Sequence, residues 1–274
     1  LKRDFGIVAV FTSYDPRAEF SAPTTGVVGQ SIFIWSSIAS FKRDDKTKQP
    51  NVLIEYQIID DWNTLGMRAT SSCSVKVDEL FVPEHRVQSM AIGLPGHVFK
   101  GAAANPNPMF RMPTTAYGGH TPAAAIVGAA QGGVDVMVDW VKSRSTAYTG
   151  AKMRDFAMVQ WRIGLAAAKV DAARLVLRND CLQADATIKS GRSLTLEEKL
   201  RNKRNCAASV RLCVEAVDSL VEMAGANGIY DSAPLQRLFR DAHAAAAHIN
   251  FSTDVQLAPW ALLSLGGEYK LPTM

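Results

Sequence analysis

Two histidines lie in an alanine-rich segment near the end of the sequence, PLQRLFRDAHAAAAHIN at 234–250. His243 and His248 are five residues apart, and on one helix their side chains would point about 140° away from each other. They cannot bind one metal ion as histidines four residues apart do, so we expect no metal site. The alanines before His248 leave room beside it for a flat ligand. Close helix packing explains the same alanines, and both interpretations stay open at this point.

The signatures of several common enzyme classes are missing from the sequence. There is no Walker phosphate loop, no GxGxxG dinucleotide motif, no HExxH metal motif and no GxSxG nucleophile motif. A pair of ExxH motifs, which di-iron helix bundles carry, is missing as well. Any catalysis must therefore depend on a different arrangement of side chains.

The composition is that of a globular protein. Of the 274 residues, 47% are hydrophobic and 20% are charged, and the formal net charge is +4. Acidic residues interrupt the basic runs, so we expect no nucleic-acid partner. The four cysteines form neither a CxxC pair nor a disulfide framework, which favours a reducing compartment. With no cleavage site after the N-terminus and no apolar stretch of roughly 20 residues, we expect a cytoplasmic protein without a membrane span.

Two parts of different composition follow each other along the chain. VLIEYQIIDDW and CSVKVDELFVP place apolar residues at alternate positions, as strands do, and NTLGMRATSS connects them. A stretch rich in proline and glycine then breaks regular structure before an alanine- and leucine-rich remainder. We predict a β domain at 26–100, a linker at 101–116 and a helical region at 117–274.

The helical region should form a four-helix bundle. Thr121 and Pro122 are typical of a helix start, and SLTLEEK at 193–199 resembles a capping box. Apolar residues recur at spacings of three and four, which is typical of helices that bury one face. The predicted helices run from 121 to 144, from 153 to 187, from 195 to 224, and from 234 to beyond His248.

Two segments resemble the acyl-CoA dehydrogenase superfamily. DDWNTLGMRATSSCSVKVDELFVPEHRV (60–87) is similar to its strand-turn-strand signature, and MAGANGIYDSAPLQRLFRDAHAAAAH (223–248) is similar to its closing signature. The resemblance implies an α+β fold in which a β domain precedes a C-terminal four-helix bundle. It also implies that the usual N-terminal helical domain is largely absent, with residues 1–25 as a remnant.

The resemblance favours one branch of this superfamily. Acyl-CoA dehydrogenases commonly place a glutamate base eight residues after the aspartate of the Arg-Asp pair, where this sequence has Ile249. The two-component flavin-dependent monooxygenases, related to hydroxyphenylacetate hydroxylase and dibenzothiophene monooxygenase, have a histidine seven residues after that aspartate, which here is His248. The GMRATSS turn is also similar to this branch, except that Ser71 replaces its usual glycine.

The resemblance further implies a set of flavin contacts. Arg144 matches an arginine that reaches the flavin pyrophosphate, often across a subunit interface, and the GANG turn lets backbone approach the same group. By itself that turn is more readily a helix C-cap, whereas the segment around Arg68 is equally a plain hairpin turn. The implied cofactor-binding residues are Arg144, Gly225, Ala226, Gly228, Arg68, Thr70, Ser72, Trp35, Ser36 and Ser37.

The function implied is that of a flavin-dependent monooxygenase. It would take reduced FMN or FAD from a separate flavin reductase and use O2, through a C4a-hydroperoxide, to oxygenate a small aromatic or heteroaromatic molecule. An imidazole suits this chemistry because it can donate a hydrogen bond near neutral pH, so His248 is the expected catalytic residue. A homotetramer is expected. The alternatives are an acyl-CoA dehydrogenase-like flavoenzyme and a catalytically incomplete bundle for oligomerisation or ligand binding.

Two further groups of residues are expected to have structural roles. Arg240 and Asp241 are adjacent and point about 100° apart, so we expect them to form ion pairs with neighbouring helices. YGGH at 117–120 precedes the first long helix, and we expect His120 to be an exposed loop residue more readily than a substrate contact.

Overall fold

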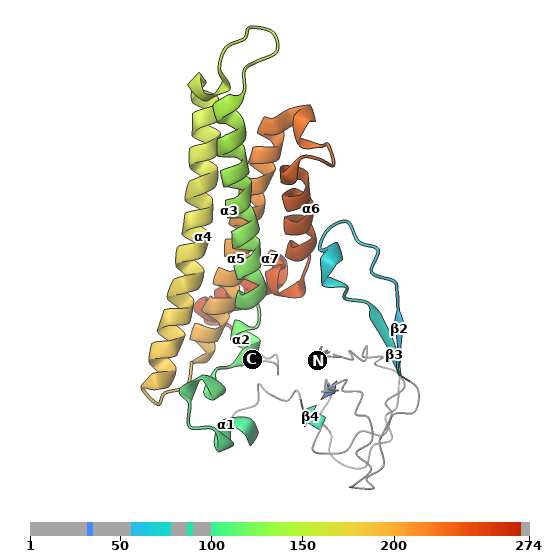
Figure 1. Ribbon diagram of the computed structural model, residues 1–274. Coiled ribbons are helices and arrows are strands. Elements are labelled where there is room, and N and C mark those ends of the chain that lie inside the picture. The colour runs from blue at the N-terminus through green and yellow to red at the C-terminus, as the bar shows by residue number, and fades with distance from the viewer. Residues whose placement is uncertain (1–31, 35–55, 78–86, 90–99, 270–274) are drawn as a thin grey trace. The chain divides into compact units, whose positions relative to one another are not determined.

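The computed structural model of the chain describes residues 32–34, 56–77, 87–89 and 100–269 (Figure 1). These residues belong to two compact units. One unit takes in residues 1–62 and 71–97, and the other takes in residues 63–70 together with residues 98–272. The turn that connects two of the strands is therefore part of the helical unit.

Short antiparallel strands make up the regular structure described in the first unit. Strand β1 (Ile32–Ile34) pairs with β4 (Val87–Ser89), and β2 (Tyr56–Ile59) pairs with β3 (Ser74–Val77). In the second pair Tyr56 lies opposite Val77, and Ile58 lies opposite Val75. The strands expected in the two alternating segments are thus present at these residues. The greater part of the predicted β domain lies outside the described residues.

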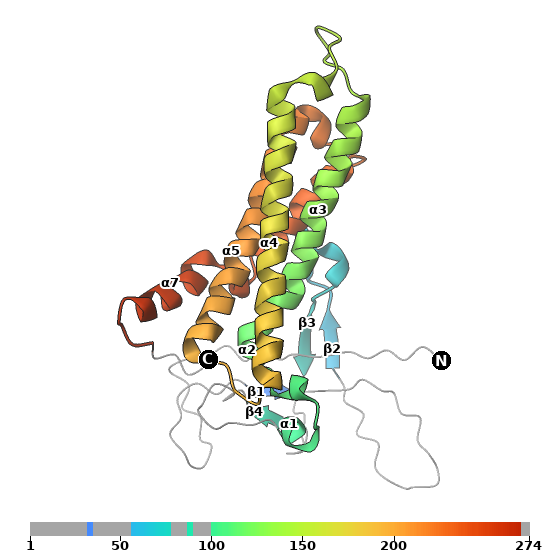
Figure 2. The same cartoon turned by 90° about the vertical axis from the view of Figure 1, so that its left-hand side faces the viewer.

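Long helices form the second unit. The first three are α3 (His120–Ser143), α4 (Ala157–Lys189) and α5 (Leu196–Ala224), and they are followed by α6 (Pro234–Ala246) and α7 (Thr253–Ser264). Two short helices, α1 (Lys100–Ala104) and α2 (Thr114–Tyr117), precede them. Helix α5 packs against α3, α4, α6 and α7, so it is the central helix (Figure 2).

The helix boundaries agree with the local signals in some places and differ in others. The capping box at the start of α5 is confirmed: Thr195 Oγ1 accepts the Glu198 N–H at 3.2 Å, and Glu198 Oε2 accepts the Thr195 N–H at 2.8 Å. The predicted cap at Thr121 is wrong, because α3 begins at His120 with Gly119 at the cap position. Helix α7 was not predicted.

The core of the bundle comes from one face of each long helix. On α4 the buried positions recur at spacings of three and four, and they include Ala166 and Ala173, whose small side chains let a neighbouring helix approach closely. The largest fully buried apolar side chains are Met137, Val170, Leu200, Val210, Val217 and Leu220. These residues come from α3, α4 and α5, so the three helices share one core.

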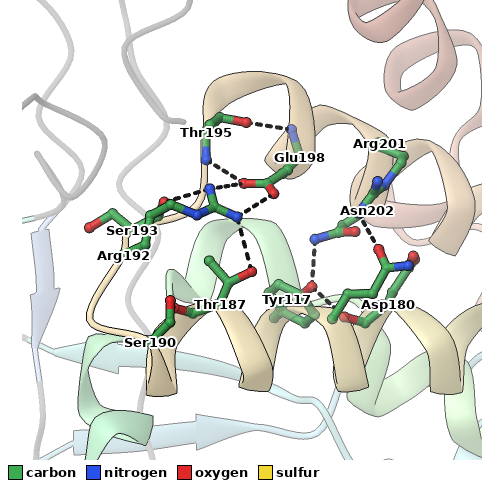
Figure 3. A network of polar contacts seen from close by, with 11 residues as sticks. Tyr117, Asp180, Thr187, Ser190, Arg192, Ser193, Thr195, Glu198, Arg201 and Asn202 are labelled. Carbon is green, nitrogen blue, oxygen red and sulfur yellow. Dashed lines mark hydrogen bonds and ion pairs between the residues drawn. The ribbon is translucent and has the colours of Figure 1, made fainter.

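A polar network closes the end of the bundle where α4 turns into α5 (Figure 3). Arg192 donates two hydrogen bonds to the carboxylate of Glu198, at 2.8 and 2.9 Å. This contact, with the N–H of Thr195, holds the pKa of Glu198 at about 2, far below its ordinary value. Deeper in the bundle, the Tyr117 hydroxyl accepts a hydrogen bond from Asn202 and donates one to the backbone oxygen of Asp180.

Helix α3 is long and apolar enough, by composition, to cross a bilayer, with 24 residues and a mean hydropathy of 1.2 over its most apolar window. This differs from the expectation that no stretch reaches such a length. Its buried residues, among them Ala123, Ala130 and Met137, line the core of the bundle. A core helix meets the same criteria as a membrane span, so the finding carries no further conclusion.

Candidate functional site

A cavity of about 310 Å³ opens at the end of the bundle where α3 ends and α6 begins. Arg144, the residue that caps the C-terminus of α3, lies at this cavity with Trp140 one turn earlier. The guanidinium of Arg144 stacks over the Trp140 ring, 4.8 Å from its centroid. Stacking on an aromatic face holds the planar cation in a fixed direction and leaves its edge for hydrogen bonds to an anion.

The GANG segment lies on the other side of the same cavity. It forms the short 3₁₀ helix η5 (Gly225–Gly228) directly after α5, and Asn227 and Gly228 line the cavity. Gly225 has φ of 55° and ψ of −143°, a conformation that side chains rarely adopt. Gly228 is buried, and a Cβ there would come within 2.9 Å of the Ala224 Cβ. Gly225 is therefore favoured by its backbone conformation, and Gly228 is favoured by the closeness of the Ala224 side chain.

The structure thus brings together part of the predicted cofactor set. Arg144 and Gly228 share one cavity, while Gly225 and Ala226 belong to the turn that forms its wall. Asn227 was not predicted, although its position between the two glycines was a signal for it. A cation, an amide and a glycine-rich backbone in one cavity are a donor set that suits a phosphate group. Gly225 is also the C-cap of α5, so the simpler reading of this turn holds as well.

Arg68 and Thr70 lie in the turn between β2 and β3, on the short 3₁₀ helix η1 (Arg68–Thr70). Both are exposed, and the Arg68 Nε donates to the backbone oxygen of Thr64 at 2.8 Å. Ser72 is exposed and belongs to the other unit. Ser71 has φ of 45°, a left-handed conformation that serine adopts at a cost.

The Arg-Asp pair of α6 differs from its prediction. The partners of Arg240 and Asp241 in the described structure are not charged residues of neighbouring helices. Arg240 Nη1 donates to the backbone oxygen of Leu65 at 2.9 Å, and Asp241 Oδ1 accepts the backbone N–H of Met67 at 2.7 Å. The pair therefore binds the turn that carries Arg68 and Thr70.

His248 lies outside the helix in which it was predicted. Helix α6 ends at Ala246, and His248 caps the 3₁₀ helix η6 (Ile249–Phe251) by accepting the Asn250 N–H on Nδ1 at 3.1 Å. Because Nδ1 is the acceptor, a neutral ring carries its proton on Nε2, which is left as the donor. The side chain is exposed, with its ring 5.7 Å from that of Phe251. The prediction that the fourth helix continues past His248 is therefore wrong.

His243 has a structural role. Its Nε2 lies 2.7 Å from the Asp218 carboxylate on α5, and its ring packs against Phe239 at 4.4 Å. His243 lies on α6, whereas His248 caps the following 3₁₀ helix. The angle of about 140° expected for two histidines on one helix therefore does not apply. Among the described residues no group of three histidine, cysteine or acidic side chains could hold a metal ion.

His120 is buried, contrary to the expectation of an exposed loop residue. It is the first residue of α3 and is only 8% exposed, with Nε2 3.4 Å from the fully buried Asp180 carboxylate. Asn205 donates to the other carboxylate oxygen at 2.9 Å. Asp180 was not predicted, although it occupies the buried register of α4, and a charge in that register was the available signal. Burial, and then Asp180, raise the pKa of nearby Cys206 to about 12, so this thiol stays protonated.

The structure does not bring all of the predicted site residues into one site. Trp35, Ser36 and Ser37 lie outside the described residues. The cavity at Arg144 is lined by neither His248 nor Arg68. The helical unit thus presents the predicted contacts as separate groups on different elements.

Comparison with known proteins agrees with the motifs. Residues 120–253 match the family model described as acyl-CoA dehydrogenase, C-terminal domain. The chain is 33% identical over 195 residues to the oxygenase subunit HsaA of a flavin-dependent monooxygenase from Rhodococcus jostii (strain RHA1), which covers 71% of this chain and 51% of that protein. It is 34% identical over 208 residues to the oxygenase component of an FADH(2)-dependent resorcinol hydroxylase from Rhizobium sp. (strain MTP-10005). This alignment covers 73% of this chain and 51% of that protein.

The fold agrees as well. The crystal structure of 3-HSA hydroxylase from Rhodococcus sp. RHA1 superposes with a TM-score of 0.75 and 30% identity, over 80% of this chain and 56% of that one. The chain spans about half the length of the curated relatives it matches. Residues 120–253 are thus similar to the acyl-CoA dehydrogenase C-terminal domain, and the resemblance inferred from the two motifs, to the flavin-dependent monooxygenase branch of that superfamily, is confirmed as a similarity.

Proposed function

We propose that the chain serves in the oxygenase component of a two-component flavin-dependent monooxygenase. It would receive reduced FMN or FAD from a separate reductase and use O2 to oxygenate a small aromatic or heteroaromatic molecule. The relatives named as oxygenase components, one of them an FADH(2)-dependent resorcinol hydroxylase, support this class of reaction. The observation that carries the proposal is the cavity that joins Arg144 to the Gly225–Gly228 turn.

The cavity fits the phosphate end of a flavin. Arg144 would bind a phosphate oxygen through the free edge of its guanidinium, and Asn227 and the backbone at Gly228 would add hydrogen bonds. Arg68, Thr70 and Ser72 would contact the cofactor elsewhere, and Trp35, Ser36 and Ser37 complete the proposed set. Bound reduced flavin would supply the electrons that activate O2.

His248 is the proposed catalytic residue. Its cap on η6 fixes the ring and leaves Nε2–H as a donor, which can stabilise negative charge on an oxygen atom beside it. The chemistry needs a site from which water is excluded, whereas His248 is exposed in this chain. We therefore infer that the cover over His248 comes from outside the described part of the helical unit.

We propose that the chain self-associates, with a homotetramer as the expected state. Helix α4 supports this, because it has an apolar stripe on the side away from the core. The stripe follows exposed positions at spacings of three and four, as in a coiled-coil seam, with one polar member, Asn179. Its apolar members are Met158, Trp161, Leu165, Ala168, Ala172, Leu175 and Leu182. Exposed apolar stripes of this length mark interaction surfaces. Sedimentation of the chain and of Leu165→Glu/Leu175→Glu tests this, since the double variant should shift toward the monomer.

Other parts of the proposal concern the rest of the chain. A β domain over 26–100, a linker over 101–116 and a bundle over 117–274 remain the proposed division. A cytoplasmic location is also proposed.

The experiment that tests the function measures the transfer of an oxygen atom from O2 to the product. The chain is mixed anaerobically with reduced FAD or reduced FMN and a phenol such as resorcinol, and ¹⁸O2 is then added. Incorporation of one ¹⁸O atom into the product supports a monooxygenase. Quantitative release of hydrogen peroxide with no labelled product from any phenol tested would count against it.

A further inference from the structure

The Arg-Asp pair of α6 fastens the turn at residues 64–70 to the bundle. Asp241 Oδ1 accepts the Met67 N–H at 2.7 Å, and Arg240 Nη1 donates to the Leu65 oxygen at 2.9 Å. The guanidinium of Arg240 is itself held by Gln236, whose Oε1 accepts from Nε at 2.8 Å. Two charged side chains thus bind two backbone groups of one turn, and hydrogen bonds to charged groups are among the stronger ones in proteins.

Gly66 lets the turn lie directly on the backbone of the helix. It is buried, and a Cβ there would overlap the carbonyl oxygen of Arg240 and come within 2.8 Å of the Asp241 nitrogen. No side chain fits between the two backbones, so glycine is needed at this position. The contact is therefore specific to Gly66 in this turn and to the backbone of Arg240 and Asp241 in α6.

Met67 is held in a conformation that it would not adopt by preference. Its φ is 56°, in the left-handed region that is unfavourable for a residue with a side chain. Its oxygen accepts both the N–H of Thr70 at 3.1 Å and the Thr70 hydroxyl at 2.8 Å. A strained residue persists where surrounding contacts fix it, and Asp241 is the contact that fixes the N–H of Met67 from outside the turn.

Arg68 follows Met67 directly, and Thr70 closes the turn. Arg68 is oriented from within the turn, since its Nε donates to the Thr64 oxygen at 2.8 Å, and the Thr64 hydroxyl donates to the Gly66 oxygen at 2.7 Å. The direction of both side chains therefore depends on the backbone that Arg240 and Asp241 hold.

We propose that Arg240 and Asp241 are positioning residues for the flavin site. They hold the 64–70 turn in the conformation in which Arg68 and Thr70 bind flavin, and they act without touching the cofactor. This inference rests on the proposed function, because that function assigns Arg68 and Thr70 to the cofactor. Its first part, the control of the turn by Asp241, can be measured without any flavin.

The first experiment measures amide hydrogen exchange at Met67 in the flavin-free chain. Loss of a hydrogen bond to a carboxylate should raise exchange at this amide by roughly tenfold or more in Asp241→Ala. Asp241→Asn keeps an acceptor and should give a smaller rise. Arg237→Ala, an exposed cation one turn earlier on α6, is the matched control and should leave Met67 unchanged. Unchanged exchange at Met67 in Asp241→Ala overturns the proposal.

The second experiment measures the Kd of reduced FAD and of reduced FMN, anaerobically, in the same variants. Asp241→Ala should raise the Kd by about tenfold, Asp241→Asn should restore most of the affinity, and Arg237→Ala should match the parent. Exchange at core amides of α5 reports whether the bundle is intact, and a general rise there together with weak binding in Asp241→Asn would indicate a merely structural role. Faster exchange at Met67 with an unchanged Kd also overturns the proposal.

Arg68→Ala separates this proposal from the function on which it rests. If Arg68→Ala and Asp241→Ala weaken flavin binding alike, the positioning role and the proposed function are both supported. If Asp241→Ala weakens binding while Arg68→Ala and Thr70→Ala do not, the assignment of these two residues to the cofactor fails, and with it the positioning role. If the parent chain binds neither flavin while Met67 exchange still responds to Asp241→Ala, the proposed function fails and the turn contact alone remains.

Discussion

The two ends of the helical bundle differ in how their polar groups are arranged. At one end, Arg144 and the Gly225–Gly228 turn surround an open cavity. At the other end, Tyr117, Asp180 and Asn202 are linked by hydrogen bonds inside the bundle (Figure 3). Buried polar groups cost free energy unless they are paired, whereas groups at an open cavity remain available to a ligand. The first end is therefore suited to binding and the second to fixing the helices.

The largest expected effect is on stability at the closed end. Asp180→Ala removes a fully buried carboxylate and leaves His120 and Asn205 without it, so we expect a loss of about 3 kcal/mol in the free energy of unfolding. Denaturant unfolding followed by circular dichroism measures this. Asp171→Ala, on the exposed side of the same helix, should change stability by less than about 0.5 kcal/mol. Equal effects in both variants would remove the distinction between the two ends.

Arg144→Ala, in contrast to Asp180→Ala, should weaken flavin binding and leave stability nearly unchanged. Loss of a charge-assisted hydrogen bond to phosphate should raise the Kd of reduced FAD roughly 10- to 100-fold, while the free energy of unfolding changes by less than about 0.5 kcal/mol. Anaerobic titration measures the Kd. Arg154→Ala, a nearby exposed arginine whose ion-pair partner is Asp155, is the control and should bind like the parent. Unchanged affinity in Arg144→Ala would exclude this cavity as the phosphate site.

Gly225→Ala tests whether the open end is under backbone strain. A side chain at φ of 55° and ψ of −143° should cost about 1–3 kcal/mol of unfolding free energy. By contrast Gly164→Ala, in the middle of α4 with open space around it, should stabilise the chain by roughly 0.5–1 kcal/mol. If Gly225→Ala is as stable as the parent, the turn does not depend on glycine.

The smallest expected effect concerns pH at the closed end. The pKa of Glu198 is lowered to about 2, chiefly by the Arg192 hydrogen bond, from an ordinary value of 4.5. The stabilisation from this ion pair is therefore complete above about pH 4.5 and is lost as pH falls toward 2. Glu198→Gln should cost no more than about 1 kcal/mol at neutral pH, since the pair is partly exposed. Urea unfolding at pH 7 and pH 3 measures the difference in unfolding free energy between the parent and Glu198→Gln. This difference should be smaller at pH 3 than at pH 7, and a larger difference at pH 3 would contradict the prediction.

Local signals in the sequence were sufficient for some elements. Helix α5 begins and ends where its capping box and Gly225 indicate, because both signals act within a few residues of the helix ends. The association of Arg144 with the glycine turn also followed from the sequence, through the family resemblance.

Long-range contacts decided the rest. Nothing local marks the end of α6 at Ala246, since alanine favours helix, and the following Asn250 packs against Gly119 from a distant part of the chain. Arg240 and Asp241 each bind a backbone group more than a hundred positions away, and adjacent charges alone suggested ordinary ion pairs. Asp180 was detectable in principle, because it interrupts an otherwise apolar register on α4.

The central claim is that this chain holds reduced flavin while it reacts with oxygen, with His248 assisting. The most direct test mixes the anaerobic complex of the chain and reduced FAD with O2 and compares the times of O2 consumption and hydrogen peroxide release. A delay between the two in the parent, clearly shortened in His248→Ala, is the predicted result. Simultaneous consumption and release in the parent, or the same delay in both proteins, would contradict the account.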